Sequence, residues 1–191
     1  MTTPFLHEER RGRIAILTMD RAESMNAIGT IEDCDNIVDT FFQLGNDRSV
    51  SAIVLTGAGR AFCTGGNIKG IRDRQGIGPL DQPDSTAANY RRGVQRATRA
   101  MLDCDVPMIA AINGHAIGLG LDLACVCDMR VAAEDAVFGV FCLCGHRFRS
   151  VQEHRGDCQR SLALCLCADS GISDALQPDS ESPVSRLCRR L

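Results

Sequence analysis

The chain has 191 residues, which is enough for one domain with a hydrophobic core, and its formal net charge of −3 predicts no general attraction to nucleic acid or to an anionic membrane. Aromatic residues make up only 4% and tryptophan is absent, which argues against a surface that stacks on bases. No apolar run approaches the length of a membrane span, and the N-terminus lacks the apolar stretch of a signal peptide. We therefore expect a cytoplasmic protein without a nucleic-acid or membrane partner.

The first half of the chain predicts strands that alternate with helices. Alternation of apolar and polar residues predicts a strand over 13–21. Thr30 is placed to cap a helix that continues to about Leu44 with one apolar face. An apolar run predicts a buried strand over 51–57. Residues 71–88 are rich in Gly, Pro, Asp and Gln, and this composition predicts a loop.

The second half continues the alternation as far as residue 139. A second helix is predicted over 89–102, with arginines on one side that are best interpreted as a solvated face. An apolar run predicts a buried strand over 108–112, a short apolar helix follows over 121–126, and another strand follows over 126–132.

Two glycine-bearing turns each follow one of the apolar strands. The first contains Gly65 and Gly66, and the second contains Gly118 and Gly120 and opens a helix. Glycine-rich turns are commonly nothing more than turns. Two such turns together, however, can point two N–H groups at one carbonyl oxygen, which suits chemistry that passes through an enolate or a tetrahedral oxyanion. Asp122 lies one turn inside the second helix, within reach of the same substrate.

Four sequence blocks carry a resemblance to a known family: RAESMNA (21–27), AFCTGGNIK (61–69), INGHAIGLGLDLACVCD (112–128) and RVAAEDAVF (130–138). In this order and spacing they resemble the crotonase superfamily, the enoyl-CoA hydratase/isomerase family, over about residues 10–139. The resemblance implies an α/β fold with a crotonase-like spiral of ββα units. It also implies acyl-CoA thioester substrates, no metal, and no cofactor other than the coenzyme A of the substrate itself.

The resemblance assigns roles to individual positions. The oxyanion amides fall on Gly66 and Leu119, and the first catalytic carboxylate falls on Asp122. The coenzyme A-binding loop falls on Gly66, Asn67, Ile68 and Lys69. An alternative role for Asp122 is to satisfy first-turn amides of its own helix.

The chain departs from the family pattern in two places. Leu119 stands where the family usually has a small residue, and Cys142 stands where its hydratases carry a second acid. The chain is therefore expected to be an acyl-CoA-processing enzyme that stabilises a thioester enolate, with hydration, isomerisation and thioester hydrolysis all open. The alternative is a catalytically inactive, acyl-CoA-binding or truncated family member.

The sequence changes in character after residue 139. Residues 140–191 are rich in Cys, Arg and Ser, so we expect a crotonase-like core over 1–139 followed by an irregular, poorly ordered tail. The homotrimer implied by the family is expected to be compromised by this altered C-terminus.

The chain has eleven cysteines, but a disulfide framework is disfavoured for a protein without a secretory signal. The Cys-x-Cys pairs are a poor match to metal-ligand spacing, so no metal site is expected. We interpret Cys63 and His115 as packing residues rather than as a nucleophile and a base.

Overall fold

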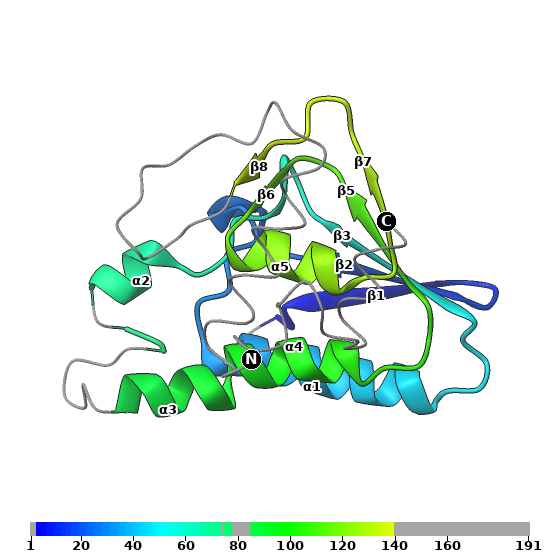
Figure 1. The fold of residues 1–191 in the computed structure, drawn as a ribbon, viewed down its shortest axis with the longest axis horizontal. Helices are drawn as coiled ribbons and strands as arrows, with labels where there is room; N and C mark the ends of the chain where they lie inside the picture. The colour runs from blue at the N-terminus through cyan, green and yellow to red at the C-terminus, as the bar shows by residue number, and fades with distance from the viewer. Residues whose placement is uncertain (1–2, 74, 78–84, 140–191) are drawn as a thin grey trace, which may run out of the picture. The chain divides into compact units, whose positions relative to one another are not determined.

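The computed structural model describes residues 3–73, 75–77 and 85–139 (Figure 1). The expectations for residues 140–191, including the irregular tail and the position of Cys142, lie outside the described residues. Among the residues that are described, none of the helices combines the length and the apolarity that are needed to cross a bilayer.

The larger of two sheets has five strands in the order β1-β2-β3-β5-β7. These strands are β1 (Leu6–Arg11), β2 (Ile14–Met19), β3 (Ala52–Gly57), β5 (Met108–Ile112) and β7 (Met129–Ala132). β1 is antiparallel to β2, and the remaining pairs are parallel. Along β2 the side chains of Ala15, Leu17 and Met19 are buried, as the alternating sequence predicts.

The smaller sheet has three strands, β4 (Ala61–Cys63), β6 (His115–Ile117) and β8 (Phe138–Gly139), in the order β4-β6-β8. Each strand follows a strand of the larger sheet after a short turn, so the chain repeats strand, short strand and helix. The neighbouring short strands are parallel. This arrangement confirms the predicted α/β fold of repeated ββα units.

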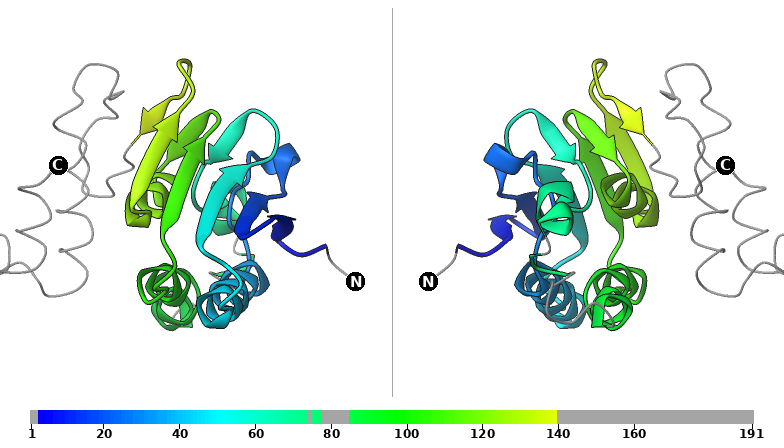
Figure 2. Two further views of the ribbon diagram at one scale, coloured as in Figure 1. Left: turned by 90° about the vertical axis from the view of Figure 1, so that its right-hand side faces the viewer. Right: turned by 90° about the vertical axis from the view of Figure 1, so that its left-hand side faces the viewer.

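Five α-helices and one short 3₁₀ helix (Ala22–Ser24) connect the described strands; the α-helices are α1 (Ile31–Asn46), α2 (Ile68–Arg72), α3 (Ser85–Arg92), α4 (Val94–Leu102) and α5 (Leu119–Val126). α1 begins where the sequence predicts, because Thr30 and Asp33 form a reciprocal capping box. α1 and α4 lie side by side against one face of the larger sheet (Figure 2).

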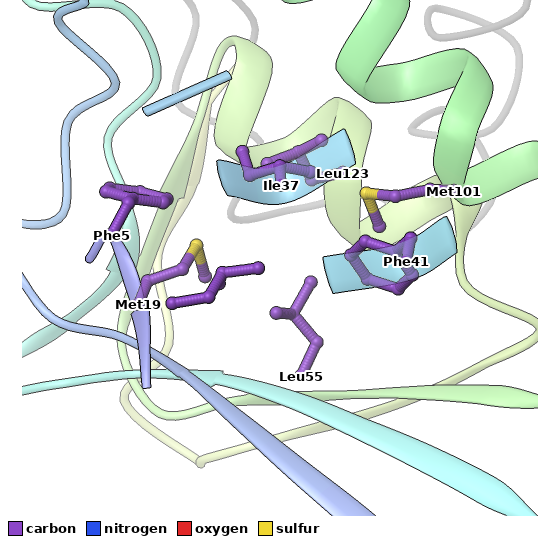
Figure 3. Close-up of a pocket in the computed structure, with 8 residues that line it drawn as sticks. Phe5, Met19, Ile37, Phe41, Leu55, Met101 and Leu123 are labelled. Atoms are coloured by element: carbon purple, nitrogen blue, oxygen red, sulfur yellow. The ribbon is translucent and has the colours of Figure 1, made fainter. Parts of the chain in front are cut away.

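The hydrophobic core lies between the larger sheet and helices α1, α4 and α5. The core contains a small gap of about 10 Å³ with an entirely apolar lining. Figure 3 shows the side chains that surround it. The lining comprises Phe5, Leu6, Met19, Ile37, Phe41, Leu55, Met101 and Leu123. A volume this small lies at the lower limit for one water molecule, so the gap is a packing defect and not a substrate pocket.

Two of the predicted boundaries are wrong. The loop predicted over 71–88 is helical at both ends, because α2 extends to Arg72 and α3 begins at Ser85; residues 78–84 lie outside the described residues. The single helix predicted over 89–102 is interrupted at Gly93, whose backbone angles (φ −95°, ψ −94°) are not helical. The end of the predicted loop is helical because the alanines at 87 and 88 favour a helix more strongly than the polar residues around them oppose it.

Candidate active site

The turn that follows β4 is held against the chain segment that follows the short 3₁₀ helix. The Thr64 amide donates to the Met25 carbonyl at 3.1 Å. The Ile28 amide donates to the Gly65 carbonyl at 2.8 Å, and the Asn67 amide donates back to the Ile28 carbonyl at 2.9 Å. The segment around Met25–Ile28 therefore acts as a template that fixes the backbone of this turn.

Asn26 ties the same segment to the strand before the turn. Its fully buried side chain donates through Nδ2 to the carbonyl oxygens of Ala58 (2.9 Å), Ala61 (2.8 Å) and Phe62 (3.1 Å). Its Oδ1 accepts a hydrogen bond from the Arg21 amide at 2.9 Å. The sequence pattern predicts no role for Asn26. The only local signal is the tolerance of asparagine for the left-handed backbone, and Asn26 does have a φ of 57°.

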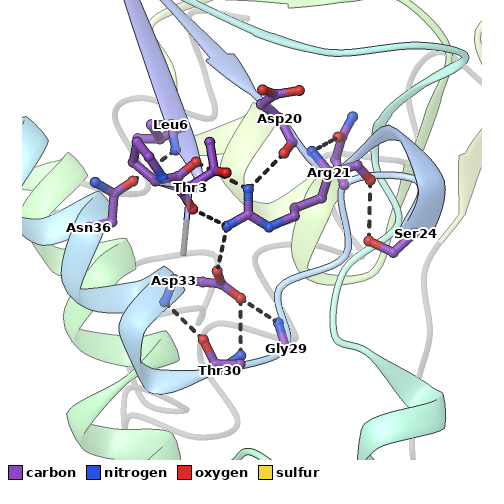
Figure 4. A network of polar contacts seen from close by, with 11 residues as sticks. Thr3, Leu6, Asp20, Arg21, Ser24, Gly29, Thr30, Asp33 and Asn36 are labelled. Atoms are coloured by element: carbon purple, nitrogen blue, oxygen red, sulfur yellow. Dashed lines mark hydrogen bonds and ion pairs between the residues drawn. The ribbon is translucent and has the colours of Figure 1, made fainter. Parts of the chain in front are cut away.

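A second polar network anchors the start of this segment (Figure 4). The Arg21 guanidinium donates to the carbonyl oxygens of Pro4 at 3.1 Å and Asp20 at 2.8 Å. Its Nη2 also lies 3.7 Å from Oδ1 of Asp33, the residue that closes the capping box with Thr30. The N-terminal segment, the template and the start of α1 are therefore linked through one residue, because the backbone amide of Arg21 bonds to Asn26 while its guanidinium contacts Pro4 and Asp33.

Within the part of the chain that the structure describes, the Gly66 amide has no hydrogen-bond partner, unlike its neighbours in this turn. The amides of residues 64 and 67 donate as described, and the Gly65 amide donates to Cys63 Sγ at 3.4 Å. Among the described residues, no acceptor is bonded to the Gly66 N–H. The N–H and C=O groups of a trans peptide point in opposite directions. Because Ile28 holds the Gly65 carbonyl, the Gly66 N–H is directed away from the template.

The second turn presents a similar amide at the start of α5. Gly118 has a φ of 53° and a ψ of −124°, a combination that only glycine adopts readily. Its carbonyl accepts hydrogen bonds from the amides of Leu121 (2.9 Å) and Asp122 (3.0 Å), which fixes the Gly118–Leu119 peptide plane. Within the described part of the chain, the Leu119 and Gly120 amides have no acceptor. Unpaired amides of this kind are typical of a helix N-terminus.

The two turns touch each other. A methyl group placed on Gly65 would lie 2.8 Å from the Ile117 carbonyl oxygen and 3.1 Å from the Leu119 nitrogen, so no side chain fits between them. Gly65 also has a φ of 86°, which disfavours any other residue. The Gly66 and Leu119 amides, which have no acceptor among the described residues, therefore lie on adjoining turns. The Leu119 side chain packs against the hydrophobic core, which accommodates this departure from a small residue.

Asp122 lies in the first turn of α5 with a partly buried side chain. No residue described in the structure donates a hydrogen bond to its carboxylate or forms an ion pair with it, so the alternative role as a cap of its own helix is not observed. Burial without a compensating partner raises the pKa of Asp122 to about 6. A carboxyl group with this pKa can both release and accept a proton near neutral pH.

The remaining residues of the predicted coenzyme A-binding loop form the start of α2. Asn67 caps this helix, because its Oδ1 accepts the Gly70 amide at 3.0 Å. The side chains of Ile68 and Lys69 are exposed. Ile71, one turn further, flanks Gly66: its Cδ1 lies 3.6 Å from a methyl group placed on that glycine. The loop therefore combines a free amide, apolar side chains and one cation.

Cys63 and His115, which the sequence interprets as packing residues, lie in β4 and β6. Cys63 is fully buried, and burial raises the pKa of its thiol to about 12, so it is not a thiolate nucleophile. His115 is a partly buried residue of β6. The described residues contain no group of three or more His, Cys, Asp or Glu side chains that could hold a metal ion.

Comparison with known proteins relates this arrangement to curated relatives. A probable enoyl-CoA hydratase of Rhizobium meliloti is 36% identical over 133 residues, which cover 69% of this chain and 47% of that protein. A probable mitochondrial enoyl-CoA hydratase of Dictyostelium discoideum is 33% identical over 133 residues, which cover 69% of this chain and 43% of that protein. The chain thus spans about half the length of the curated relatives it matches.

Solved structures and a family model agree with these relatives. A probable enoyl-CoA hydratase/isomerase from Mycobacterium abscessus superposes with a TM-score of 0.60 at 36% identity, covering 71% of this chain and 49% of that one. An enoyl-CoA hydratase/isomerase from Mycobacterium paratuberculosis gives a TM-score of 0.62 at 28% identity, covering 72% and 53%. The family model described as enoyl-CoA hydratase/isomerase matches residues 9–145. The chain therefore belongs to the enoyl-CoA hydratase/isomerase family of the crotonase superfamily.

Proposed function

We propose that the chain binds acyl-CoA thioesters and stabilises their enolates in an oxyanion hole formed by the Gly66 and Leu119 amides. The observation that carries this proposal is that the Gly66 and Leu119 amides, on adjoining turns, have no acceptor among the described residues, and that Asp122 on the helix beside them has no partner there either. A preorganised donor aimed at developing negative charge contributes about 3 kcal/mol to transition-state stabilisation.

The chemistry follows from where charge develops. Removal of an α-proton, or addition of water to the β-carbon of an enoyl thioester, moves an electron pair onto the carbonyl oxygen of the thioester. The two amides meet this oxygen, and they gain most as it becomes negative, so they favour the transition state over the bound substrate. Asp122 would transfer the proton, since its raised pKa of about 6 lies close to neutral pH.

The loop over residues 66–69 would bind the coenzyme A portion of the substrate. Gly66 belongs to the first turn, and Asn67, Ile68 and Lys69 follow it directly, so a thioester held in the oxyanion hole would have its coenzyme A moiety next to these residues. The exposed Lys69 side chain offers a cation to phosphate groups. We propose no cofactor besides the coenzyme A that belongs to the substrate.

Turnover of crotonyl-CoA by the purified chain, followed through the absorbance of the conjugated thioester, tests hydration directly. A 3-enoyl-CoA tests isomerisation, and a saturated acyl-CoA with a thiol reagent tests hydrolysis. The proposal expects turnover in at least one of these assays. Absence of turnover in all three by a folded chain would refute the enzymatic part of the proposal.

A second candidate function is binding of acyl-CoA without turnover. It is favoured by one observation, the cysteine at position 142 where the family's hydratases carry their second acid. Calorimetric binding of butyryl-CoA, together with no turnover in the three assays above, would support this candidate over the first.

A further inference from the structure

The thiol of Cys63 lies between the template segment and the first turn. Its Sγ donates to the Asn26 carbonyl at 3.1 Å and accepts the Gly65 N–H at 3.4 Å. The side chain is fully buried, and the raised pKa keeps the thiol protonated, as the first of these bonds requires. The sulfur thus connects Asn26 of the template to Gly65 of the first turn through two hydrogen bonds.

We propose that Cys63 is a positioning residue for the Gly66 amide, acting through these two hydrogen bonds to set the direction of the Gly66 N–H. The consequence for catalysis rests on the proposed function, whereas the consequence for the geometry of the turn does not. Cys63 itself touches no reacting atom in this role.

The geometric argument concerns the two peptide planes that meet at Gly65. The plane before Gly65 is held by the sulfur, through the Gly65 N–H. The plane after it carries the Gly66 N–H and is held by Ile28, through the Gly65 carbonyl. Glycine has the least restricted backbone angles of any residue, so the backbone conformation at Gly65 depends on both of these hydrogen bonds. Loss of the sulfur removes one of them.

The backbone of Cys63 also contacts the second turn. A methyl group placed on Gly120 would lie only 1.9 Å from the Cys63 carbonyl oxygen, so the start of α5 rests directly on this residue. Cys63 therefore bonds to the first turn through its thiol and supports the second turn through its carbonyl. One residue thereby sets both members of the proposed oxyanion hole relative to each other.

The alternative role for Cys63 is that of a small apolar residue that fills space. Cys34 provides a matched control, because its side chain is also fully buried, and its sulfur makes no hydrogen bond to any residue that the structure describes. Cys34→Ala removes the same atoms from the core on α1. Cys63→Ser keeps a donor and an acceptor at the site, whereas Cys63→Ala removes both.

The orientation is measured without ligand on the ¹⁵N-labelled full chain. In Cys63→Ala we expect the N–H residual dipolar coupling of Gly66 to change, and exchange of the Gly65 amide to accelerate about tenfold or more. Cys63→Ser should remain closer to the wild type, and Cys34→Ala should leave both quantities unchanged. An unchanged Gly66 coupling in folded Cys63→Ala would overturn the proposal.

The catalytic consequence is measured separately with the acyl-CoA that the wild type turns over. We expect Cys63→Ala to lower kcat about tenfold with little change in KM, because a misdirected amide loses most at the charged transition state. Partial recovery in Cys63→Ser is the second expected result. A decrease in kcat no larger than that of Cys34→Ala would overturn the positioning role. A wild type without turnover would refute the proposed enzymatic activity, while the dipolar couplings would still decide the orientation.

Discussion

The proposed proton transfer depends on the carboxyl group of Asp122. Asp122→Asn retains the size of the side chain but cannot exchange a proton, so we expect kcat to fall by about 100-fold or more while binding of coenzyme A esters is nearly unchanged. Asp39→Asn, on the exposed face of α1, is the control and should have no effect. Steady-state kinetics and calorimetry measure the two quantities. Unchanged turnover in Asp122→Asn would move the chemistry to another residue.

The raised pKa of Asp122 also predicts how stability depends on pH. The pKa rises from 3.8 to about 6 on folding, because burial disfavours the charged form. Between these values the folded state binds more protons than the unfolded state, so the free energy of unfolding falls as pH rises through this window. In Asp122→Asn the side chain does not titrate, so this pH dependence of the free energy of unfolding is removed. Urea denaturation from pH 4 to 7 should therefore show the variant gaining stability relative to the wild type as pH increases. Parallel profiles would show that the carboxyl group is solvated.

Asn26 should matter for stability rather than for proton transfer. Asn26→Ala removes the acceptor of the Arg21 amide and a donor to three carbonyl groups, of which the Ala61 carbonyl keeps a hydrogen bond from Asn113 at 3.4 Å. It also places alanine in the left-handed region, so we expect a loss of about 3 kcal/mol in the free energy of unfolding. Asn46→Ala, which removes one exposed hydrogen bond to the Phe42 carbonyl, should change it by less than about 0.5 kcal/mol. A loss below about 1 kcal/mol in Asn26→Ala would contradict the role assigned to this network.

The sequence identified some residues of the candidate site and missed others for a physical reason. Gly66 and Asp122 lie in or just after glycine-bearing turns whose local pattern can be recognised, and the resemblance to the family assigned the roles of Gly66, Leu119 and Asp122. Asn26 and Cys63 each make one hydrogen bond to a nearby amide, that of Arg21 and that of Gly65 respectively. Their other hydrogen-bond partners are 32 to 37 residues away along the chain. No local pattern reports contacts of that range, so their roles become visible only when the turns are folded together.

At the scale of secondary-structure elements, the sequence predicted those that carry their own pattern. The strands of the larger sheet other than β1, and helix α1, have apolar residues at regular spacing and were predicted at nearly the observed positions. The strands β4, β6 and β8 have at most three residues each, too few to show a period. β1 was missed because only Leu6 in it is buried and the rest is polar or charged. Pairing with neighbours, not local propensity, defines these four strands.

The contact between α5 and β4 gives a prediction at this scale. Gly120→Ala would place a methyl group 1.9 Å from the Cys63 carbonyl oxygen, which forces α5 away from β4. We expect a loss of about 3 kcal/mol in the free energy of unfolding, measured by urea denaturation. Gly70→Ala is the control, because a methyl group there meets only ordinary contacts at 3.5 Å or more with Asn67. Equal stability of the two variants would show that α5 does not rest on β4 as described.

At the scale of the whole described fold, the repetition of ββα units creates the candidate site. β4 and β6 come from successive units and pair in parallel in the smaller sheet. The carboxyl ends of parallel neighbours lie at the same edge, so the turns that follow β4 and β6 meet there. This is why two turns separated by about fifty residues adjoin, and why free amides from both reach one small region. Sequence spacing alone does not specify this pairing.

The central claim is that the Gly66 and Leu119 amides bind one thioester carbonyl, and ¹H–¹⁵N spectra of the full chain test it most directly. Titration with butyryl-CoA should shift both amide protons downfield, because each gains an acceptor that it lacks among the described residues. Coenzyme A alone, which has no thioester carbonyl, should shift residues of the loop over 67–69 but not these two protons. Downfield shifts of both protons with butyryl-CoA only would support the account. Binding of butyryl-CoA that leaves the Gly66 and Leu119 amides unshifted would contradict it.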